Sequence, residues 1–369
     1  MERVPAHKAI AAGRRYCYPG RPPLPEHTTV ASNSDTYPAV SVIVVTYNSA
    51  RTLGETLASL DALDYPGDYE VIVVDGGSED DTEAVAASHD VRFLSAPGAT
   101  IGACRNRGVD AANGEYVACT DSDCAVPERW LTSHVDCLRD APDHVVGVGG
   151  PNRTFPDDSP FAKLVESVQG SPFGSGGSPQ SRDIDTLREV GSVPACNVLY
   201  DGALFDSYQY DDGVNVGEDA EFHHRLERDG YRFRFNPLNP VSHHLPASLG
   251  AVARKSRSYG YAMARIQRRH RRVVRWYSPL PSLGLGVGAL AGLDALRTRR
   301  LRAPLLLFLL FLPVAVSVTV AALRDVKRPV ALLAPVVLLV QYGCYGVGFL
   351  EGLKSREPWP LRTTERRRL

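Results

Sequence analysis

The sequence predicts an α/β domain with a mostly parallel sheet and flanking helices, followed by a C-terminal transmembrane helical hairpin. Between residues 39 and 245, short runs rich in Val and Ile alternate with segments in which apolar residues recur at helical spacing. This alternation is typical of a parallel sheet covered by helices on both faces. Two uncharged apolar runs follow, residues 303–323 and 330–350. At about 1.5 Å per residue, each is long enough to cross a bilayer.

Charge divides the chain at nearly the same place. Residues 39–245 hold 34 acidic and 14 basic side chains, a net charge of −20, whereas residues 246–369 hold 5 acidic and 22 basic ones, a net charge of +17. This asymmetry predicts a soluble body joined to an end that meets an anionic partner. Lysine is scarce, with 5 Lys against 36 Arg. An acidic, lysine-poor domain is typical of salt-rich cytoplasm, where salt screens self-repulsion, so a halophilic source is a hypothesis.

The elements of the first domain follow from hydrophobic periodicity. Runs of β-branched residues between turn residues predict strands, and apolar residues three or four apart predict helices. The predicted order is strand 39–48, helix 49–64, strand 69–78, helix 79–89, strand 91–96, helix 104–113 and strand 115–123. Three strands end in TYN, DGGS and DSD. Asp75, Asp121 and Asp123 should therefore gather at the carboxyl edge of the sheet, where such sheets bind ligands.

Several common sites are missing from the sequence. No GxGxxG follows the first strand and no GxxxxGK[ST] occurs, which argues against a dinucleotide fingerprint and a P-loop. The seven cysteines are irregularly spaced and form no CxxC pair. They predict free thiols in a reducing compartment rather than a disulfide framework or a zinc finger.

The basic end is predicted to meet a membrane. Residues 254–277 carry nine Lys or Arg, no acid and four aromatic side chains. This composition suits a helix on anionic headgroups, and the adjacent apolar runs favour a membrane over nucleic acid. Residues 279–296 are apolar but Gly-rich and contain Asp294, so we expect an interfacial or re-entrant segment. Arginines on both sides of the apolar pair place both flanks, and the α/β domain, in the cytoplasm.

These boundaries predict a multi-pass protein of the cell membrane with five parts. They are a polar, Pro-rich tail (1–38), the α/β domain (39–245), a basic interfacial segment (246–302), two transmembrane helices (303–350) and a basic cytoplasmic tail (351–369). The N-terminal tail carries no functional signal.

Four segments, VSVIVVTYN, VIVVDGGSEDDT, CRNRGVDAANGEYVACTDSD and VGEDAEFHHRLERDGYRF, resemble in order and spacing the landmarks of family 2 glycosyltransferases with the GT-A fold. The resemblance covers residues 39–245. The apolar hairpin is similar to that of membrane-bound members acting on lipid-linked sugars, including archaeal N-glycosylation and surface-polysaccharide enzymes. The resemblance implies inverting transfer from a nucleoside-diphosphate sugar (UDP- or GDP-linked) to a hydroxyl of a lipid-linked saccharide or surface polysaccharide.

The resemblance also implies a metal site at the DSD motif. Asp123 would ligate Mg²⁺ or Mn²⁺, and Asp121 would reach the donor ribose or, through water, the metal. Acids beside an anionic diphosphate need such a cation, which also neutralises the leaving group. His243 or His244 resembles the histidine that completes this site in some members. The alternatives are an ordinary loop histidine and, for the acids, a solvated turn.

Three further residues would bind the donor. Asp75 would accept a hydrogen bond from the pyrimidine ring, Tyr47 would stack on the base, and Arg105 would approach the phosphates. The family commonly has a second Asp where this chain has Gly76, which leaves one contact open. The alternatives are a helix N-terminal acid for Asp75 and a surface salt bridge for Arg105.

The GED motif would serve the acceptor. Asp219 matches the family's general base, with Glu218 beside it, because an attacking hydroxyl must lose its proton. Paired acids raise one another's pKa, and helix capping is the alternative role. Arg275 and Trp276 stand where the acceptor motif QxxRW would lie, with Arg272 in place of Gln.

Other functions fit some of the same residues. A polyprenyl-phosphate (dolichyl-phosphate) sugar transferase has an acceptor that is already anionic and needs no base, so the GED motif favours a hydroxyl acceptor. A processive polysaccharide synthase is disfavoured because two spans are too few for a channel. A catalytically inactive membrane scaffold is the non-enzymatic alternative, and the intact Asp121, Asp123 and Asp219 argue against it.

Overall fold

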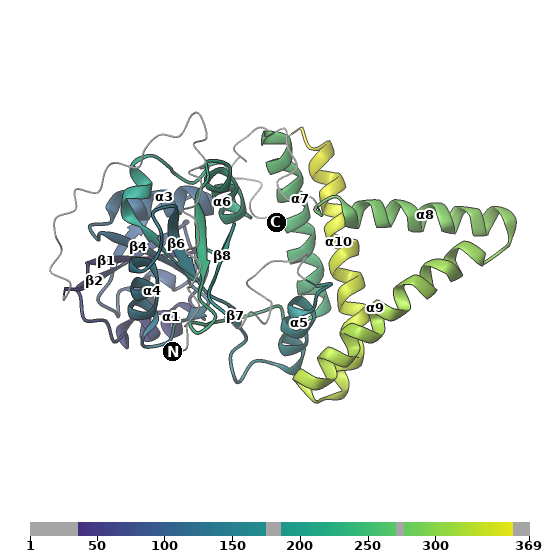
Figure 1. Ribbon diagram of the computed structural model, residues 1–369, viewed down its shortest axis with the longest axis horizontal. Coiled ribbons are helices and arrows are strands. Elements are labelled where there is room, and N and C mark those ends of the chain that lie inside the picture. Colours follow the sequence, from purple (N-terminus) through teal and green to yellow (C-terminus); the bar gives the residue numbers. More distant parts are fainter. Residues whose placement is uncertain (1–35, 175–185, 271–276, 357–369) are drawn as a thin grey trace, which may run out of the picture.

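An eight-stranded mixed sheet crosses the first part of the molecule, with strand order β3, β2, β1, β4, β9, β6, β10 and β8 (Figure 1). The computed structural model describes residues 36–174, 186–270 and 277–356. In chain order the elements of this domain are β1 (Val40–Thr46), α1 (Leu53–Asp61), β2 (Tyr69–Asp75), α2 (Thr82–Ala86), β3 (Arg92–Ser95), α3 (Ile101–Ala111), β4 (Tyr116–Asp121), β5 (Cys124–Ala125), α4 (Trp130–Arg139), β6 (Val145–Gly149), β7 (Asn152–Arg153), α5 (Pro160–Gly170), β8 (Arg188–Val190), β9 (Val198–Asp201), η2 (Gly202–Asp206), α6 (Glu218–Arg228), β10 (Arg232–Phe235) and β11 (Val241–His243).

The first four strands of the sheet confirm the predicted parallel half. β1 pairs in parallel with β2 and β4, and β2 with β3. β9 then enters antiparallel between β4 and β6, and β8 closes the far edge antiparallel to β10, so the sheet as a whole is mixed. A second sheet, in the order β5, β11, β7, lies beside the end of β4.

Alternate residues of each central strand face opposite sides of the sheet. In β1, Val42 and Val44 belong to one apolar cluster and Ile43 to the other, and all three are fully buried. The same division places Val73 of β2 on one face and Ile72 on the other. Each such side chain contributes about 1.5–3 kcal/mol to the stability, so the central strands form a firm base for the loops at their ends.

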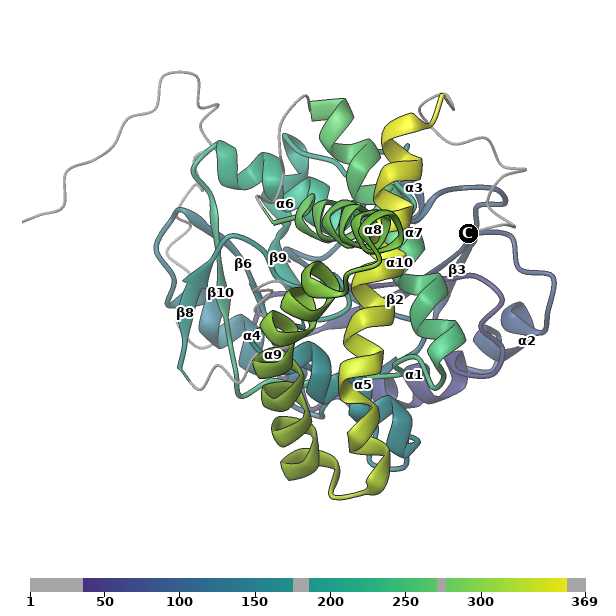
Figure 2. The same cartoon turned by 90° about the vertical axis from the view of Figure 1, so that its right-hand side faces the viewer.

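Four helices follow the domain: α7 (Leu249–His270), α8 (Leu280–Thr298), α9 (Arg302–Val326) and, after the 3₁₀ turn η3 (Pro329–Leu333), α10 (Ala334–Lys354). α7 and α10 pack side by side between the sheet domain and a V formed by α8 and α9 (Figures 1 and 2). Glycines bring their backbones close. A Cβ on Gly260 would lie 2.1 Å from the carbonyl oxygen of Tyr345, and one on Gly348 would lie 1.9 Å from that of Arg257.

The predicted apolar runs form α9 and α10, which among the described helices are the two long and apolar enough to cross a membrane. α8 corresponds to the segment predicted as interfacial or re-entrant. Large apolar side chains are exposed along α8 and α9, including Leu283, Leu290, Leu293, Leu305, Phe308 and Leu310. The predicted basic helix is α7, but α10 covers one of its faces, so it is not a free surface helix. Arg275 and Trp276 lie outside the described residues.

Candidate active site

The carboxyl ends of β1, β2 and β4 meet at one edge of the sheet, as the sequence predicts. In the strand register, Asp75 lies opposite Thr46, and Asp121 lies opposite Val45. Asp123 follows two residues after β4 ends. The acids of DGGS and DSD therefore stand at the ends of β2 and β4, the two strands that flank β1, because all three strands are parallel and in register.

The carboxylate of Asp75 forms its hydrogen bonds mainly within its own turn. Its Oδ2 accepts hydrogen bonds from the backbone N–H groups of Gly77 (2.9 Å) and Ser78 (2.8 Å), and the Ser78 hydroxyl donates to Oδ1. Tyr47 is half exposed beside this turn, where a Cβ on Gly76 would lie 3.7 Å from its ring. A tyrosine ring with an open face at this edge suits stacking on a flat ligand, whereas Asp75 retains little exposed surface.

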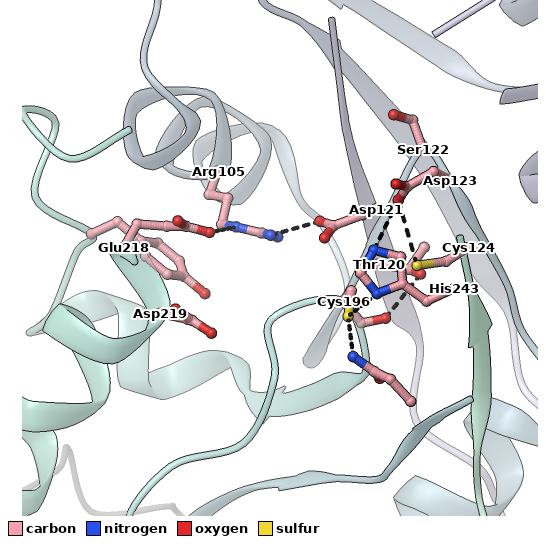
Figure 3. A network of polar contacts seen from close by, with 12 residues as sticks. Arg105, Thr120, Asp121, Ser122, Asp123, Cys124, Cys196, Glu218, Asp219 and His243 are labelled. Carbon is pink, nitrogen blue, oxygen red and sulfur yellow. Dashed lines mark hydrogen bonds and ion pairs between the residues drawn. The ribbon is translucent and has the colours of Figure 1, made fainter. Parts of the chain in front are cut away.

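Arg105 lies between two of the predicted site acids. Its Nη2 donates to Oδ1 of Asp121 (2.8 Å), and its Nε donates to Oε1 of Glu218 (3.2 Å) (Figure 3). Its side chain is 1% exposed, so the surface salt bridge considered for it is wrong. Arg105 lies on α3, which packs against β1 and β2 and whose first turn is capped by Thr100, the hydroxyl of which accepts from the N–H of Ala103. Within the described chain, Nη1 of Arg105 is buried without a hydrogen-bond partner.

Glu218 and Asp219 begin α6 but have different surroundings. Gly217, with φ +77°, turns the chain into the helix in a conformation that favours glycine. Burial raises the pKa of Glu218 to about 7, the Arg105 guanidinium opposes this, and the charge of Asp219 adds to it. Within the described residues, the only hydrogen bond to the Asp219 side chain is a local one from the N–H of Ala220 (2.7 Å). Glu218 is thus the partner of Arg105, whereas the carboxylate of Asp219 lines the cavity and can contact a ligand there.

Asp123 points to a different partner from Asp121. Its Oδ1 lies 3.5 Å from Nε2 of His243, which reaches the site because β11 pairs with β5. Burial alone would raise the pKa of Asp123, but the charge and hydrogen bond of His243 lower it to about 2. Burial would likewise lower the pKa of His243, yet Asp123 raises it to about 10. The pair is held by mutual charge, so a cation could replace the proton on the imidazole.

The carboxylate oxygen of Asp123 and the imidazole nitrogen of His243 are suitable ligands for a divalent cation. Two ligands on one octahedral ion at about 2.1 Å lie about 3 Å apart, close to the 3.5 Å between Asp123 and His243. An imidazole nitrogen beside a carboxylate favours Mn²⁺ over Mg²⁺, which prefers oxygen ligands. His244 does not join them. It stacks on Phe155 with ring centres 4.1 Å apart and hydrogen-bonds Asp158 at 3.0 Å.

One cavity of about 1820 Å³ connects these groups to the C-terminal helices. Its polar end is lined by Arg105, Asp121, Glu218, Asp219 and His243. Its apolar end is lined by Leu285 and Gly288 of α8 and by Leu307, Phe308 and Phe311 of α9. The cavity therefore joins an acidic site to an apolar surface.

Sequence reasoning missed three residues in this cavity, two of them cationic and one a cysteine. Arg254 and Lys255, on the first turns of α7, line its wall, and Lys255 is near enough for its charge to lower the pKa of Asp123. The sequence assigned these cations to a membrane surface, because only the packing of α7 brings them to the site. Cys196, also in the lining, carries no motif and could not be found from sequence spacing.

Comparisons with known proteins agree with the fold described above. The model of the family described as Glycosyl transferase family 2 matches residues 41–173, and that of Glycosyl transferase family group 2 matches residues 117–346. Glycosyltransferase AglE of Haloferax volcanii is 30% identical over 141 residues, which are 36% of this chain and 46% of AglE. The chain spans about half the length, or less, of several curated relatives that it matches.

Two further matches cover most of both chains. The dolichyl N-acetyl-alpha-D-glucosaminyl phosphate 3-beta-D-2,3-diacetamido-2,3-dideoxy-beta-D-glucuronosyltransferase of Methanococcus voltae is 20% identical over 85% of this chain and 97% of its own. The mannosyltransferase PcManGT from Pyrobaculum calidifontis, solved with GDP-Man and Mn²⁺, has a TM-score of 0.60 at 20% identity. That match covers 88% of this chain and 89% of PcManGT, and it shows the same GT-A fold.

Proposed function

Since the chain belongs to glycosyltransferase family 2, we propose that it is a membrane-anchored inverting enzyme. It moves a sugar from a nucleoside-diphosphate sugar to a hydroxyl of a lipid-linked saccharide or a surface polysaccharide. The observation that carries this proposal is a cavity that joins Asp219 and His243, which lies 3.5 Å from Asp123, to apolar faces of α8 and α9. A polar donor and a lipid-bearing acceptor need such a junction.

The donor would bind at the carboxyl edge of β1, β2 and β4. Asp123 and His243 would hold Mn²⁺ or Mg²⁺ there, and Tyr47 would stack on the base. The bound cation supplies charge neutralisation for the departing diphosphate. Arg105 offsets part of the charge of Asp121 and Glu218, which lowers the repulsion that the acidic edge exerts on an anionic donor. PcManGT, which was solved with GDP-Man and Mn²⁺, supports this choice of ligands.

Asp219 would act as the general base. Its carboxylate takes the proton of the acceptor hydroxyl as the oxygen attacks the anomeric carbon. The new glycosidic bond forms as the bond from that carbon to the diphosphate oxygen breaks, on the opposite face, so the configuration inverts. Asp219 suits this task because it lines the cavity. Among the described residues, its side chain accepts only a local hydrogen bond from the backbone.

The acceptor would enter from the side of the C-terminal helices. α9 and α10 would anchor the chain in the cell membrane, with the catalytic domain in the cytoplasm, and the apolar wall formed by α8 and α9 would admit a lipid chain. Arg254 and Lys255 supply cations for the phosphate groups of that lipid. The name of the Methanococcus voltae relative describes transfer to position 3 of a dolichyl-linked sugar, which supports a hydroxyl acceptor.

A polyprenyl-phosphate sugar transferase is the second candidate, because Arg254 and Lys255 could equally hold an attacking phosphate. It needs no general base, so the two candidates differ in their dependence on Asp219.

The proposed binding of the nucleotide sugar and its metal is tested by titration calorimetry of the full chain in detergent with UDP- and GDP-sugars. We expect binding that requires Mn²⁺ or Mg²⁺ and is lost in Asp123→Ala. The matched control Asp90→Ala removes an exposed acid between α2 and β3 that belongs to none of these motifs, and it should bind as the wild type does. Tight donor binding in excess EDTA would refute the metal assignment.

A further inference from the structure

Two thiols lie behind His243. The Sγ atoms of Cys124 and Cys196 and a ring nitrogen of His243 all lie within 4.8 Å of one another. They come from β5, from the turn before β9 and from β11, and Figure 3 shows them converging beside Asp123. Cys124 is fully buried and Cys196 is 5% exposed. Three ligands of two types that bind Zn²⁺, two thiols and one imidazole, thus meet in the interior, although they are separated widely in the sequence.

We propose that Cys124, Cys196 and His243 form a binding site for a thiophilic divalent cation such as Zn²⁺. This site adds two thiols to the Asp123–His243 pair assigned to the donor metal and overlaps that pair, because it shares His243 with it and can take Asp123 as a further ligand. Sulfur and imidazole ligands favour Zn²⁺, whereas Mg²⁺ and Mn²⁺ favour oxygen.

The distances fit tetrahedral coordination after small side-chain rotations. With Zn–S of about 2.3 Å and Zn–N of about 2.0 Å, neighbouring ligand atoms lie about 3.5–3.8 Å apart. Cys196 Sγ lies 4.0 Å from Nδ1 of His243, and Cys124 Sγ lies 3.8 Å from Oδ1 of Asp123. Asp123 is therefore placed to supply a fourth ligand.

The surroundings provide support and access for the ion. Nδ2 of Asn152 donates a hydrogen bond to Cys196 Sγ at 3.0 Å, a contact that stabilises a thiolate ligand. Cys196 and His243 both line the large cavity, which gives an ion a route from solvent. On binding, each thiol gives up its proton to solvent and the imidazole binds in its neutral form.

Occupation of the thiol site would compete with catalysis. An ion held by Cys124, Cys196 and Nδ1 of His243 that takes Asp123 as its fourth ligand removes this carboxylate from the donor metal, which then loses one of its two protein ligands. This consequence rests on the proposed function, whereas the thiol site itself does not. Zn²⁺ would then inhibit sugar transfer, and a chelator followed by Mn²⁺ would restore it.

The test uses Co²⁺ as a spectroscopic substitute for Zn²⁺ on the metal-free full chain, with no donor or acceptor present. We expect one Co²⁺ per chain with a near-ultraviolet thiolate-to-cobalt charge-transfer band, displaced by Zn²⁺. Cys124→Ser and Cys196→Ser should each lose intensity in this band and bind Co²⁺ at least about tenfold more weakly. Cys137→Ser, which alters a half-buried cysteine of α4 outside the cluster, should leave the spectrum unchanged.

Alkylation of the wild type provides a check that does not depend on the folding of any variant. Zn²⁺ should slow the modification of Cys196 but not of Cys137, as mapped by peptide mass spectrometry. Co²⁺ binding without a thiolate band, or a band that persists unchanged in Cys196→Ser, would overturn the proposal. If the band appears but donor binding proves independent of His243, the donor-metal assignment fails and the thiol site stands.

Discussion

Replacement of Arg105 by methionine tests the charge arrangement under the site. The substitution keeps an unbranched side chain of similar length but removes the guanidinium that pairs with Asp121 at 2.8 Å and Glu218 at 3.2 Å. The Glu218 side chain is 9% exposed, so it would remain as a buried carboxylate without a partner. Asp121, at 35% exposure, can be solvated and should contribute less to the loss.

The expected cost is that of breaking a buried ion pair from one side, about 3–5 kcal/mol. For a domain of this size, this corresponds to a fall in the melting temperature on the order of 10 °C. The loss should be smaller at pH 5 than at pH 8. Burial already raises the pKa of Glu218 to about 7, and loss of Arg105 raises it further, so at low pH the folded state takes up a proton and removes the buried charge.

Thermal unfolding of the full chain in detergent, followed by the fluorescence of the buried Trp130, measures the effect. The double variant Arg105→Met with Glu218→Gln should regain most of the stability, because the unpaired charge is gone. Arg107→Met, at an exposed position of the same helix, is the control. A loss below about 1 kcal/mol in Arg105→Met, or no recovery in the double variant, would show that the pair is not the buried network described here.

Three further changes have defined outcomes. Asp219→Asn should lower turnover about 10²–10⁴-fold with donor binding near wild type, because only the proton acceptor is lost; product assays beside calorimetry measure both, and normal turnover would remove Asp219 as the base. Burial lowers the pKa of His134 to about 4, so the folded state excludes a proton that the unfolded chain binds below its usual pKa of 6.5. Stability should therefore fall by up to about 3 kcal/mol between pH 6.5 and 4, and the urea midpoint of His134→Gln should vary less over that range. Gly348→Val should force α7 and α10 apart and lower the melting temperature by several degrees, unlike Gly343→Val, where a Cβ meets no atom within 4 Å.

The predictable part of the fold is the part that local pattern determines. Residues 42–45 and 71–74 are continuous apolar, β-branched runs, and all of them except the partly buried Val45 are buried at the centre of the sheet, as expected. The acids that end these strands meet at one edge because parallel strands share a direction.

The remainder depends on contacts between distant segments. β9 lies between β4 and β6. No pattern in the sequence between β6 and β9 predicts which strands β9 pairs with. The burial of Arg105 could not be predicted, because arginine is rarely buried unless paired and its partner Glu218 is 113 residues away. The approach of α7 to α10 depends on glycines in two helices far apart in the chain, which no local periodicity reveals.

The central claim, transfer to a hydroxyl with Asp219 as base, is tested most directly by one product assay. The full chain in lipid vesicles is given Mn²⁺, a panel of UDP- and GDP-sugars, and a mixture of polyprenyl phosphates and lipid-linked saccharides, and the lipid extract is analysed by mass spectrometry. We predict one sugar added to a lipid-linked saccharide, with configuration opposite to the donor's, and about 10²–10⁴-fold less product from Asp219→Asn. A sugar attached directly to the lipid phosphate, formed equally well by Asp219→Asn, would contradict the hydroxyl acceptor and establish the polyprenyl-phosphate reaction instead.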